Sequence, residues 1–222
     1  MFKKFAGNEY SQHGEDGILE EIFKRLGVVN NENSWAVEFG AWDGKHFNNA
    51  FALVNRGWSC VMIEGDETKF QELLKTAKEY PSIHPINAYV SQYDSGDKSL
   101  FKILKTTNIP IEFELLSIDV DSYDSDIWET FHTYNPKVVC IEVNSNPAPG
   151  TFWRHEEPPP GEISRGTSFS EMLKVGHAKG YTLVCHTGNC IFVRNDLMQY
   201  LDFPVDLINN QDALYKIGRA HV

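Results

Sequence analysis

Segments typical of β-strands and segments typical of α-helices alternate along almost the whole of this 222-residue chain. Short apolar runs, such as residues 58–63 and 138–143, are separated by segments whose apolar side chains recur every three or four positions. Such alternation is typical of parallel strands joined by helices that cross over the sheet. We therefore expect an α/β fold, and the length fits a single domain over residues 1–216.

The same patterns predict bounds for the individual elements. We expect helices within residues 11–27, 47–56, 70–80, 100–105 and 127–134, and strands over residues 34–39, 58–63, 83–90, 113–118 and 138–143. Residues 144–167 should form a long loop, of the kind that usually serves as a lid or a binding loop. A capping box at Ser168 and Glu171 predicts a helix to about Lys179, and strands 181–185 and 190–194 should pair antiparallel. The result is a Rossmann-like, mostly parallel seven-stranded sheet with a C-terminal antiparallel hairpin and helices on both faces.

Composition and charge exclude several classes of function. With 20 Lys and Arg against 31 Asp and Glu, the net charge is −11, which disfavours a nucleic acid partner. No apolar run approaches the roughly 18 residues of a membrane span, and the first residues lack a signal-peptide core. We expect a cytoplasmic protein that acts on a small molecule, with the oligomeric state open and a dimer among the options. The four cysteines lack zinc or redox spacing and should be buried thiols.

The last six residues, 217–222, have an unusual sequence. They match the translation of a common sequencing-adapter DNA read in frame. We interpret them as a non-native tail from a metagenomic read that ends in adapter.

A glycine-containing loop follows the first predicted strand. Residues 37–44 (VEFGAWDG) place Glu38 at the end of that strand, followed by Gly40, Ala41 and Gly44. Gly40 allows a tight turn against a ligand, and Gly44 allows the following helix to approach closely. The loop lacks the G-x-G-x-x-G pattern that binds a pyrophosphate. An acid-rich loop suits the zwitterionic methionine part and the sulfonium of S-adenosylmethionine (SAM), so we predict that these residues bind SAM.

Glu64 ends the second predicted strand, about 20 residues after the glycine loop. An acid at this point is placed to accept hydrogen bonds from a ribose diol. We therefore include Glu64 in the predicted cofactor site, together with Asn87 in the third predicted strand.

Five segments of the chain resemble FkbM-type SAM-dependent methyltransferases. They are residues 11–18 (SQHGEDGI), 37–44 (VEFGAWDG), 63–66 (IEGD), 116–121 (LSIDVD) and 139–144 (VCIEVN), and the similarity extends over about residues 10–195. The resemblance implies the class I methyltransferase fold, SAM as methyl donor and, often, O-methylation of sugar or natural-product hydroxyls. It also implies that Gln12 and Asp16 lie near the cofactor, whereas spacing alone makes them a helix cap.

Oxygen-bearing side chains stand at the ends of the fourth and fifth predicted strands. These are Asp119, Asp121, Glu142 and Asn144. Residues two apart in a strand share a face, and neighbouring strands would bring the two pairs together. Such hard ligands suit Mg²⁺ or Ca²⁺ better than zinc. The arrangement is similar to that of metal-dependent O-methyltransferases, which implies a cation that binds and orients an acceptor hydroxyl. In the alternative, Asp119 contacts the methionine ammonium of SAM and Asp121 caps the next helix.

Proton transfer needs a base, for which Asp119, His155 and His186 are the candidates. Each histidine has an alternative role as a structural or exposed residue. The leading hypothesis is SAM-dependent O-methylation of a small molecule or sugar. An aminopropyl transferase that uses decarboxylated SAM and a non-catalytic SAM-binding or partner-binding module are the alternatives.

Overall fold

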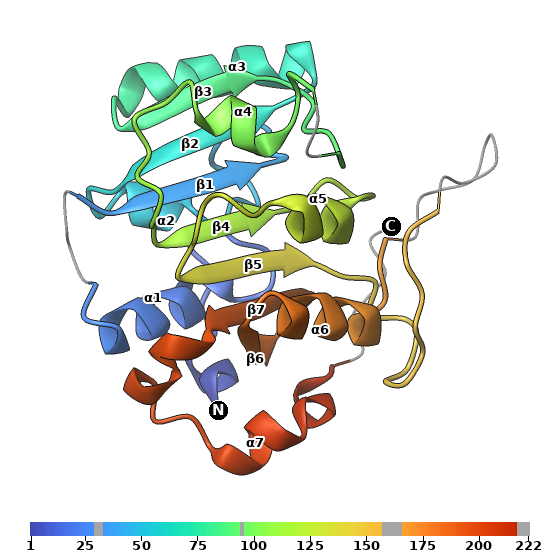
Figure 1. The fold of residues 1–222 in the computed structure, drawn as a ribbon. Helices are drawn as coiled ribbons and strands as arrows, with labels where there is room; N and C mark the ends of the chain where they lie inside the picture. The colour runs from blue at the N-terminus through green and yellow to red at the C-terminus, as the bar shows by residue number, and fades with distance from the viewer. Residues whose placement is uncertain (29–32, 94–95, 157–165, 217–222) are drawn as a thin grey trace.

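The computed structural model describes residues 1–28, 33–93, 96–156 and 166–216. Its centre is a seven-stranded sheet with the order β3-β2-β1-β4-β5-β7-β6 (Figure 1). The strands are β1 (Trp35–Phe39), β2 (Ser59–Glu64), β3 (Ile83–Asn87), β4 (Leu115–Ile118), β5 (Val138–Glu142), β6 (Tyr181–His186) and β7 (Asn189–Arg194). Neighbours among β1 to β5 pair in parallel, whereas β7 pairs antiparallel with β5 and with β6.

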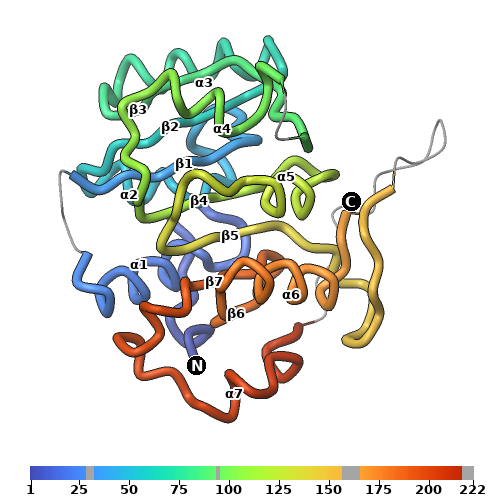
Figure 2. The backbone as a smooth tube through the Cα atoms, in the orientation of Figure 1, coloured from blue at the N-terminus to red at the C-terminus, as the bar shows by residue number. Residues whose placement is uncertain are grey.

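Helices cover both faces of the sheet. They are α1 (Glu15–Arg25), α2 (Phe51–Val54), α3 (Glu67–Glu79), α4 (Leu100–Leu104), α5 (Asp124–Thr130), α6 (Phe169–Ala178) and α7 (Val205–Asn209). Apolar residues of α1, α2 and α3 pack into one core and those of α4, α5 and α6 into the other. The N-terminal 3₁₀ turn, Phe2–Phe5, lies beside β6 at the sheet edge (Figure 2).

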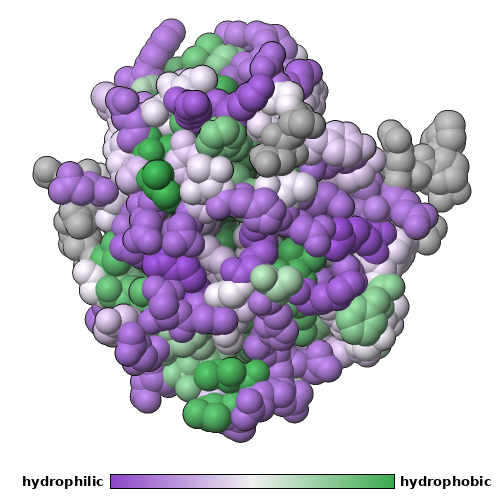
Figure 3. Space-filling model, in the orientation of Figure 1, coloured by the Kyte–Doolittle hydropathy of each residue, from purple (hydrophilic) through white to green (hydrophobic). Residues whose placement is uncertain are grey.

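Alternate residues of each strand enter opposite cores. In β1, Ala36 packs with the α1 side and Val37 and Phe39 pack with the α4 side, because side chains of a strand alternate between its faces. Nearly every central strand residue is buried on one face or the other, so the strands read as continuous apolar runs. The face of the molecule seen in Figure 3 is mostly hydrophilic, with apolar side chains in separate small patches.

The predicted fold class is confirmed. The strand order, the five parallel strands and the antiparallel β7 are the arrangement of the Rossmann-like class I methyltransferase fold. The predicted hairpin is present, with β7 inserted between β5 and β6. None of the helices in the described part of the chain is long and apolar enough to cross a membrane.

The helix predicted over residues 47–56 is wrong for its first half. Helix α2 begins only at Phe51, because the Glu38 carboxylate accepts from the amides of Asn49 and Ala50 just before it. Asp43 accepts from the amides of Lys45 and His46, and Asn48 accepts from the amide of Phe51 at 2.7 Å. The residues before α2 therefore form turns, and these turns shape the cavity described below.

Other predicted bounds shift by a few residues. Strand β3 ends at Asn87 rather than at residue 90, β4 begins at Leu115, and α5 covers Asp124–Thr130 rather than residues 127–134. Half of the predicted capping box is confirmed, since the Oγ of Ser168 accepts from the amide of Glu171 at 3.4 Å. The other half is wrong, because the amide of Ser168 donates to the Trp153 carbonyl and the Glu171 carboxylate accepts from Arg154. The proposed adapter-derived tail at 217–222, and residues 157–165 of the predicted long loop, lie outside the described residues.

Candidate functional site

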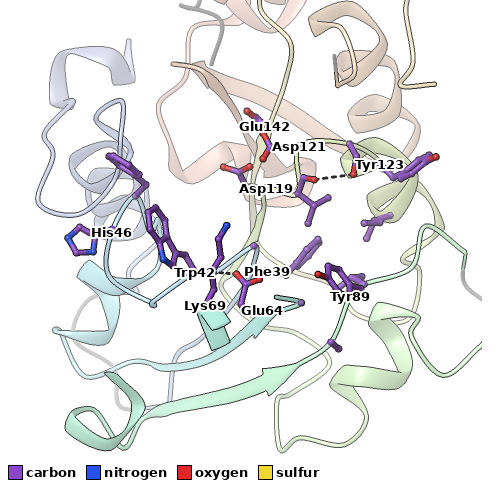
Figure 4. A pocket seen from close by; sticks show the side chains of 18 of the residues that line it. Phe39, Trp42, His46, Glu64, Lys69, Tyr89, Asp119, Asp121, Tyr123 and Glu142 are labelled. Carbon is purple, nitrogen blue, oxygen red and sulfur yellow. Dashed lines mark hydrogen bonds between the residues drawn. The ribbon is translucent and has the colours of Figure 1, made fainter. Parts of the chain in front are cut away.

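A cavity of about 550 Å³ opens at the carboxyl ends of β1, β2, β4 and β5 (Figure 4). Strands β2 and β3 lie on one side of β1, and β4 and β5 lie on the other, so the strand order reverses between β1 and β4. This reversal is where open parallel sheets bind ligands. The volume is in the range of small-molecule and cofactor pockets, which span about 300–1,000 Å³.

Gly40 forms the floor of the cavity, directly after β1. Its φ is 75°, and a Cβ atom added there would lie 1.8 Å from the carbonyl oxygen of Asp119. Only glycine therefore allows the ends of β1 and β4 to meet this closely.

The other glycine-loop residues lie behind this floor. Gly44 also has a positive φ, but a Cβ atom added there would collide with Leu73 of α3 and Met62 of β2. The missing side chain at Gly44 therefore allows these elements to pack closely and does not make room for a ligand. Ala41 is buried and donates its amide to the Ile63 carbonyl at 3.2 Å. Neither Gly44 nor Ala41 is among the cavity-lining residues.

Glu64 lines the cavity with a carboxylate that the backbone holds in place. Its two oxygens accept from the amides of Trp42 and Asp66, each at 2.8 Å, and the bond to Trp42 is drawn in Figure 4. A carboxylate has about four acceptor sites, so Glu64 retains acceptor capacity for a ligand. The side chain predicted to bind a ribose diol is thus fixed at the cavity wall.

One end of the cavity is apolar, and we call it the apolar end. It consists of Phe39 and Ile127, which belong to the core on the α4 side, and of Ala88, Val90 and Val120, which pack against that core. Next to it, the ring of Tyr89 lies over Gly65, where an added Cβ would come within 2.4 Å of the ring. Apolar side chains and an aromatic ring near a fixed carboxylate suit a heteroaromatic ring attached to a ribose.

Another part of the cavity wall is acidic. Asp119, Asp121 and Glu142 line it, with carboxylate oxygens within 4.8 Å of one another (Figure 4). Burial, followed by the charge of Glu142, raises the pKa of Asp119 well above its usual range. These three predicted residues are brought together, and we call them the acidic end.

The structural elements that carry these three residues differ from the predicted ones. Strand β4 ends at Ile118, so Asp119 and Asp121 lie in the loop after it and not on one face of a strand. Asn144 does not join them: its Oδ1 accepts from the amide of Asn146 at 3.0 Å, and it is not a lining residue.

Two predicted cofactor residues, Glu38 and Asp16, support the wall from behind. Glu38 is buried and accepts from the amides of Asn49 and Ala50 at 2.9 and 2.8 Å, and burial raises its pKa to about 7. Asp16 accepts from three successive amides, those of residues 9, 10 and 11, and so organises the segment that carries Gln12. Gln12 itself lines the cavity.

The two histidines and Asn87 lie outside the cavity lining. His155 is buried with its ring 4.5 Å from that of Tyr123, which does line the cavity. His186 has both ring nitrogens in hydrogen bonds, to the Oγ of Ser145 and to the amide of Lys216, each at 3.0 Å. Burial lowers the pKa of His186 to about 4. The side-chain amide of Asn87 donates to the backbone carbonyl of Glu64.

Several lining residues escaped the sequence analysis. Lys69 projects from the first turn of α3 with its ammonium 5.3 Å from the Trp42 ring centre. Position could have indicated Lys69, since the first turn of a helix after a parallel strand lies at the ligand-binding edge of the sheet. Tyr89, Phe47 and Tyr123 also line the cavity, and they follow no recognisable motif.

Backbone strain is concentrated at this cavity. In the described part of the chain, four non-glycine residues have a positive φ, and Trp42, Phe47 and Asp121 among them line the cavity. Their φ values are 47°, 54° and 57°. Such conformations persist only where surrounding interactions hold them, and they cluster at functional sites.

Comparison with known proteins identifies no family. No protein-family model matches the chain, and no curated protein matches it. Similar solved structures include a TehB-like SAM-dependent methyltransferase from Corynebacterium glutamicum, at 10% identity over 78% of this chain and 87% of that chain, with a TM-score of 0.43. The N-terminal domain of EvdMO1 with SAH and D-fucose is 10% identical over 84% of this chain and 83% of that chain, with a TM-score of 0.47. The glycopeptide N-methyltransferase MtfA with sinefungin is 10% identical over 83% and 87%, with a TM-score of 0.45.

At such identities and TM-scores, these neighbours carry no argument about the chemistry of this chain. The FkbM-type resemblance stays a prediction.

Proposed function

We propose that this protein is a SAM-dependent methyltransferase that acts on a hydroxyl group of a small molecule or sugar. The observation that carries the proposal is one cavity at the reversal of the strand order that combines a backbone-held Glu64 with the apolar end and the acidic end. These three parts match, in order, the ribose, the adenine and the cationic part of SAM.

The charge of the cavity favours SAM over a dinucleotide. Among the described residues that line it, four are carboxylic acids, Glu64, Asp119, Asp121 and Glu142, and one is a lysine, Lys69. Such a lining repels a pyrophosphate and attracts the sulfonium and the ammonium of SAM. Glu64 would accept from the ribose hydroxyls, the apolar end would enclose the adenine, and Gln12 and the floor at Gly40 would face the methionine part.

The acidic end supplies the polar groups for the transfer step. SAM, when bound, supplies an electrophilic methyl group on a positively charged sulfur. The acceptor hydroxyl must be held in line with that group and must lose its proton. Asp119 is the proposed proton acceptor, because its raised pKa makes its carboxylate a stronger base than an exposed aspartate. Asp121 and Glu142 would orient the hydroxyl by hydrogen bonding.

A divalent cation is a second role for the same three carboxylates. Their oxygens are close enough to share one ion, and carboxylates with additional waters suit Mg²⁺. The ion would hold the acceptor hydroxyl and lower its pKa. Asn144 does not belong to this proposed ligand set, since its oxygen accepts from a backbone amide.

The proposal is tested by incubating the protein with SAM and panels of sugars, catechols and amines, and measuring S-adenosylhomocysteine (SAH) by mass spectrometry. We expect SAH formation that depends on a hydroxyl acceptor and falls at least about 100-fold in Asp119→Asn. Turnover that persists unchanged in EDTA would refute the metal-assisted form. Tight SAM binding without transfer to any acceptor would favour a binding module, and turnover with decarboxylated SAM alone would favour an aminopropyl transferase.

A further inference from the structure

The loop between β4 and α5 carries two of the three acidic-end residues in a strained conformation. It runs from Asp119 to Tyr123, and Asp121 at its centre has a φ of 57°. Left-handed backbone is unfavourable for any residue with a Cβ, although Asp and Asn tolerate it best. Some interaction must therefore hold this loop in place.

That interaction comes from Asp124, the first residue of α5. Its Oδ1 accepts from the amide of Val120 at 2.9 Å, and its Oδ2 accepts from the amide of Ser122 at 3.0 Å. The two amides are those immediately before and after Asp121, so the carboxylate straddles the left-handed residue. The Oγ of Ser122 closes the turn by donating to the Val120 carbonyl at 3.0 Å.

Binding these two loop amides is the role that the structure gives to the Asp124 side chain. It is 2% exposed and is not a cavity-lining residue, so it does not itself meet a ligand. A buried carboxylate is unfavourable unless hydrogen bonds compensate it, and here Glu142 adds like charge nearby. The buried carboxylate of Asp124 would therefore destabilise the fold if it did not accept from the amides of Val120 and Ser122.

We propose that Asp124 is a positioning residue whose carboxylate clamps the amides of Val120 and Ser122 and thereby holds Asp119 and Asp121 at the acidic end. The importance of the acidic end for methyl transfer rests on the proposed function, but the clamp itself does not depend on it. Exchange measurements on the free protein therefore test the clamp separately from ligand binding.

The experiment compares Asp124→Asn with Asp126→Asn as the matched control. Both changes replace a carboxyl by an amide in the first turn of α5, but Asp126 pairs with the half-buried Arg154 and does not bind the loop amides. The two amides bind different oxygens of Asp124, and asparagine replaces one of these oxygens by an NH₂ group that cannot accept, so one of the two amides loses its acceptor. Amide exchange and ¹H–¹⁵N spectra of the free protein then report Val120 and Ser122 individually.

In Asp124→Asn we expect at least one of these two amides to exchange about tenfold faster or more, and its proton resonance to move upfield as the bond to a carboxylate is lost. Both amides should behave as in the unmodified protein in Asp126→Asn. Unchanged exchange and unchanged shifts in Asp124→Asn would overturn the clamp.

SAH titration tests the positioning role. We expect affinity to fall about 10- to 100-fold in Asp124→Asn and less than about threefold in Asp126→Asn. Faster exchange with unchanged SAH affinity would overturn positioning while leaving the clamp. Absence of SAH binding by the unmodified protein would refute the proposed function, and the exchange result would still decide the clamp.

A second variant covers the case in which Asp124→Asn does not fold. Adding Asp121→Gly removes the left-handed strain, because glycine adopts this φ freely. Recovery of folding in the double variant supports the clamp, and a double variant as unstable as the single one overturns it.

Discussion

Replacing Gly40 by alanine tests the geometry on which the cavity depends. The added Cβ would lie 1.8 Å from the Asp119 carbonyl oxygen, a contact with backbone that no side-chain rotation relieves. A left-handed alanine costs about 1–2 kcal/mol, and forcing apart a packed backbone costs about 1–3 kcal/mol more. The expected loss of unfolding free energy is therefore about 2–5 kcal/mol.

Gly180→Ala is the matched control for Gly40→Ala. Gly180 has a φ of 81°, close to the 75° of Gly40, but an added Cβ there has no atom within 4 Å. Only the conformational part of the penalty should appear, about 1–2 kcal/mol.

Thermal unfolding measured by circular dichroism separates the two parts. For a chain of this length each kcal/mol lowers Tm by about 2–4 °C, so Gly40→Ala should melt about 2–12 °C below Gly180→Ala. SAH affinity should also fall further in Gly40→Ala, because the floor and Asp119 are displaced. Equal Tm values and equal SAH affinities for the two variants would refute the close approach of β1 and β4.

Two further substitutions have defined outcomes. Glu64→Ala should weaken SAM binding about 10- to 100-fold by calorimetry, since hydrogen bonds to an ionised acceptor contribute about 1.5–3 kcal/mol. The control Glu67→Ala, at an exposed position of α3, should bind SAM normally. Equal SAM affinities for the two variants would exclude a role of Glu64 in binding the ribose. Glu38 has a pKa raised to about 7 by burial, so its stabilising contribution is full below about pH 4.5 and is lost as the pH rises through 7. The span is about 3 kcal/mol at most, and Glu38→Gln should flatten the curve of Tm against pH over this interval; an identical curve would contradict it.

Hydrophobic periodicity was sufficient to predict the strands of the sheet. Each buried strand appears in the sequence as a short apolar run, and the strand ends shift by only a few residues where no cap or turn residue marks them. Strand order within the C-terminal part was not predictable, because nothing in the apolar run of β7 indicates that it pairs with β5 as well as with β6. That pairing depends on long-range packing.

The failure of the predicted helix at residues 47–56 has a local physical cause. Asn48 takes the amide of Phe51, and the distant Glu38 takes the amides of Asn49 and Ala50, all within the predicted helix. Periodicity measures apolar spacing and is blind to such competition. Phe47, which the prediction placed in the helix, instead has a left-handed backbone and lines the cavity.

Strand ends indicated the acidic end correctly, because the carboxyl ends of parallel strands share one edge of the sheet. The sequence could not show that Asn144 would be engaged by a backbone amide, nor that Asp121 depends on Asp124. Both follow from loop geometry. Glu38 illustrates the same limit, since it has the expected position at the end of β1 but its carboxylate faces the turn before α2 rather than the cavity.

The central claim is that the cavity binds SAM, and calorimetric titration with SAM and SAH, with and without Mg²⁺, tests it most directly. The account predicts one site per chain with a micromolar or lower Kd that weakens in Glu64→Ala but not in Glu67→Ala. A change in heat or affinity with Mg²⁺ would support the cation at the acidic end. Absence of binding to folded protein would contradict the account and leave a methyltransferase-type fold with another use.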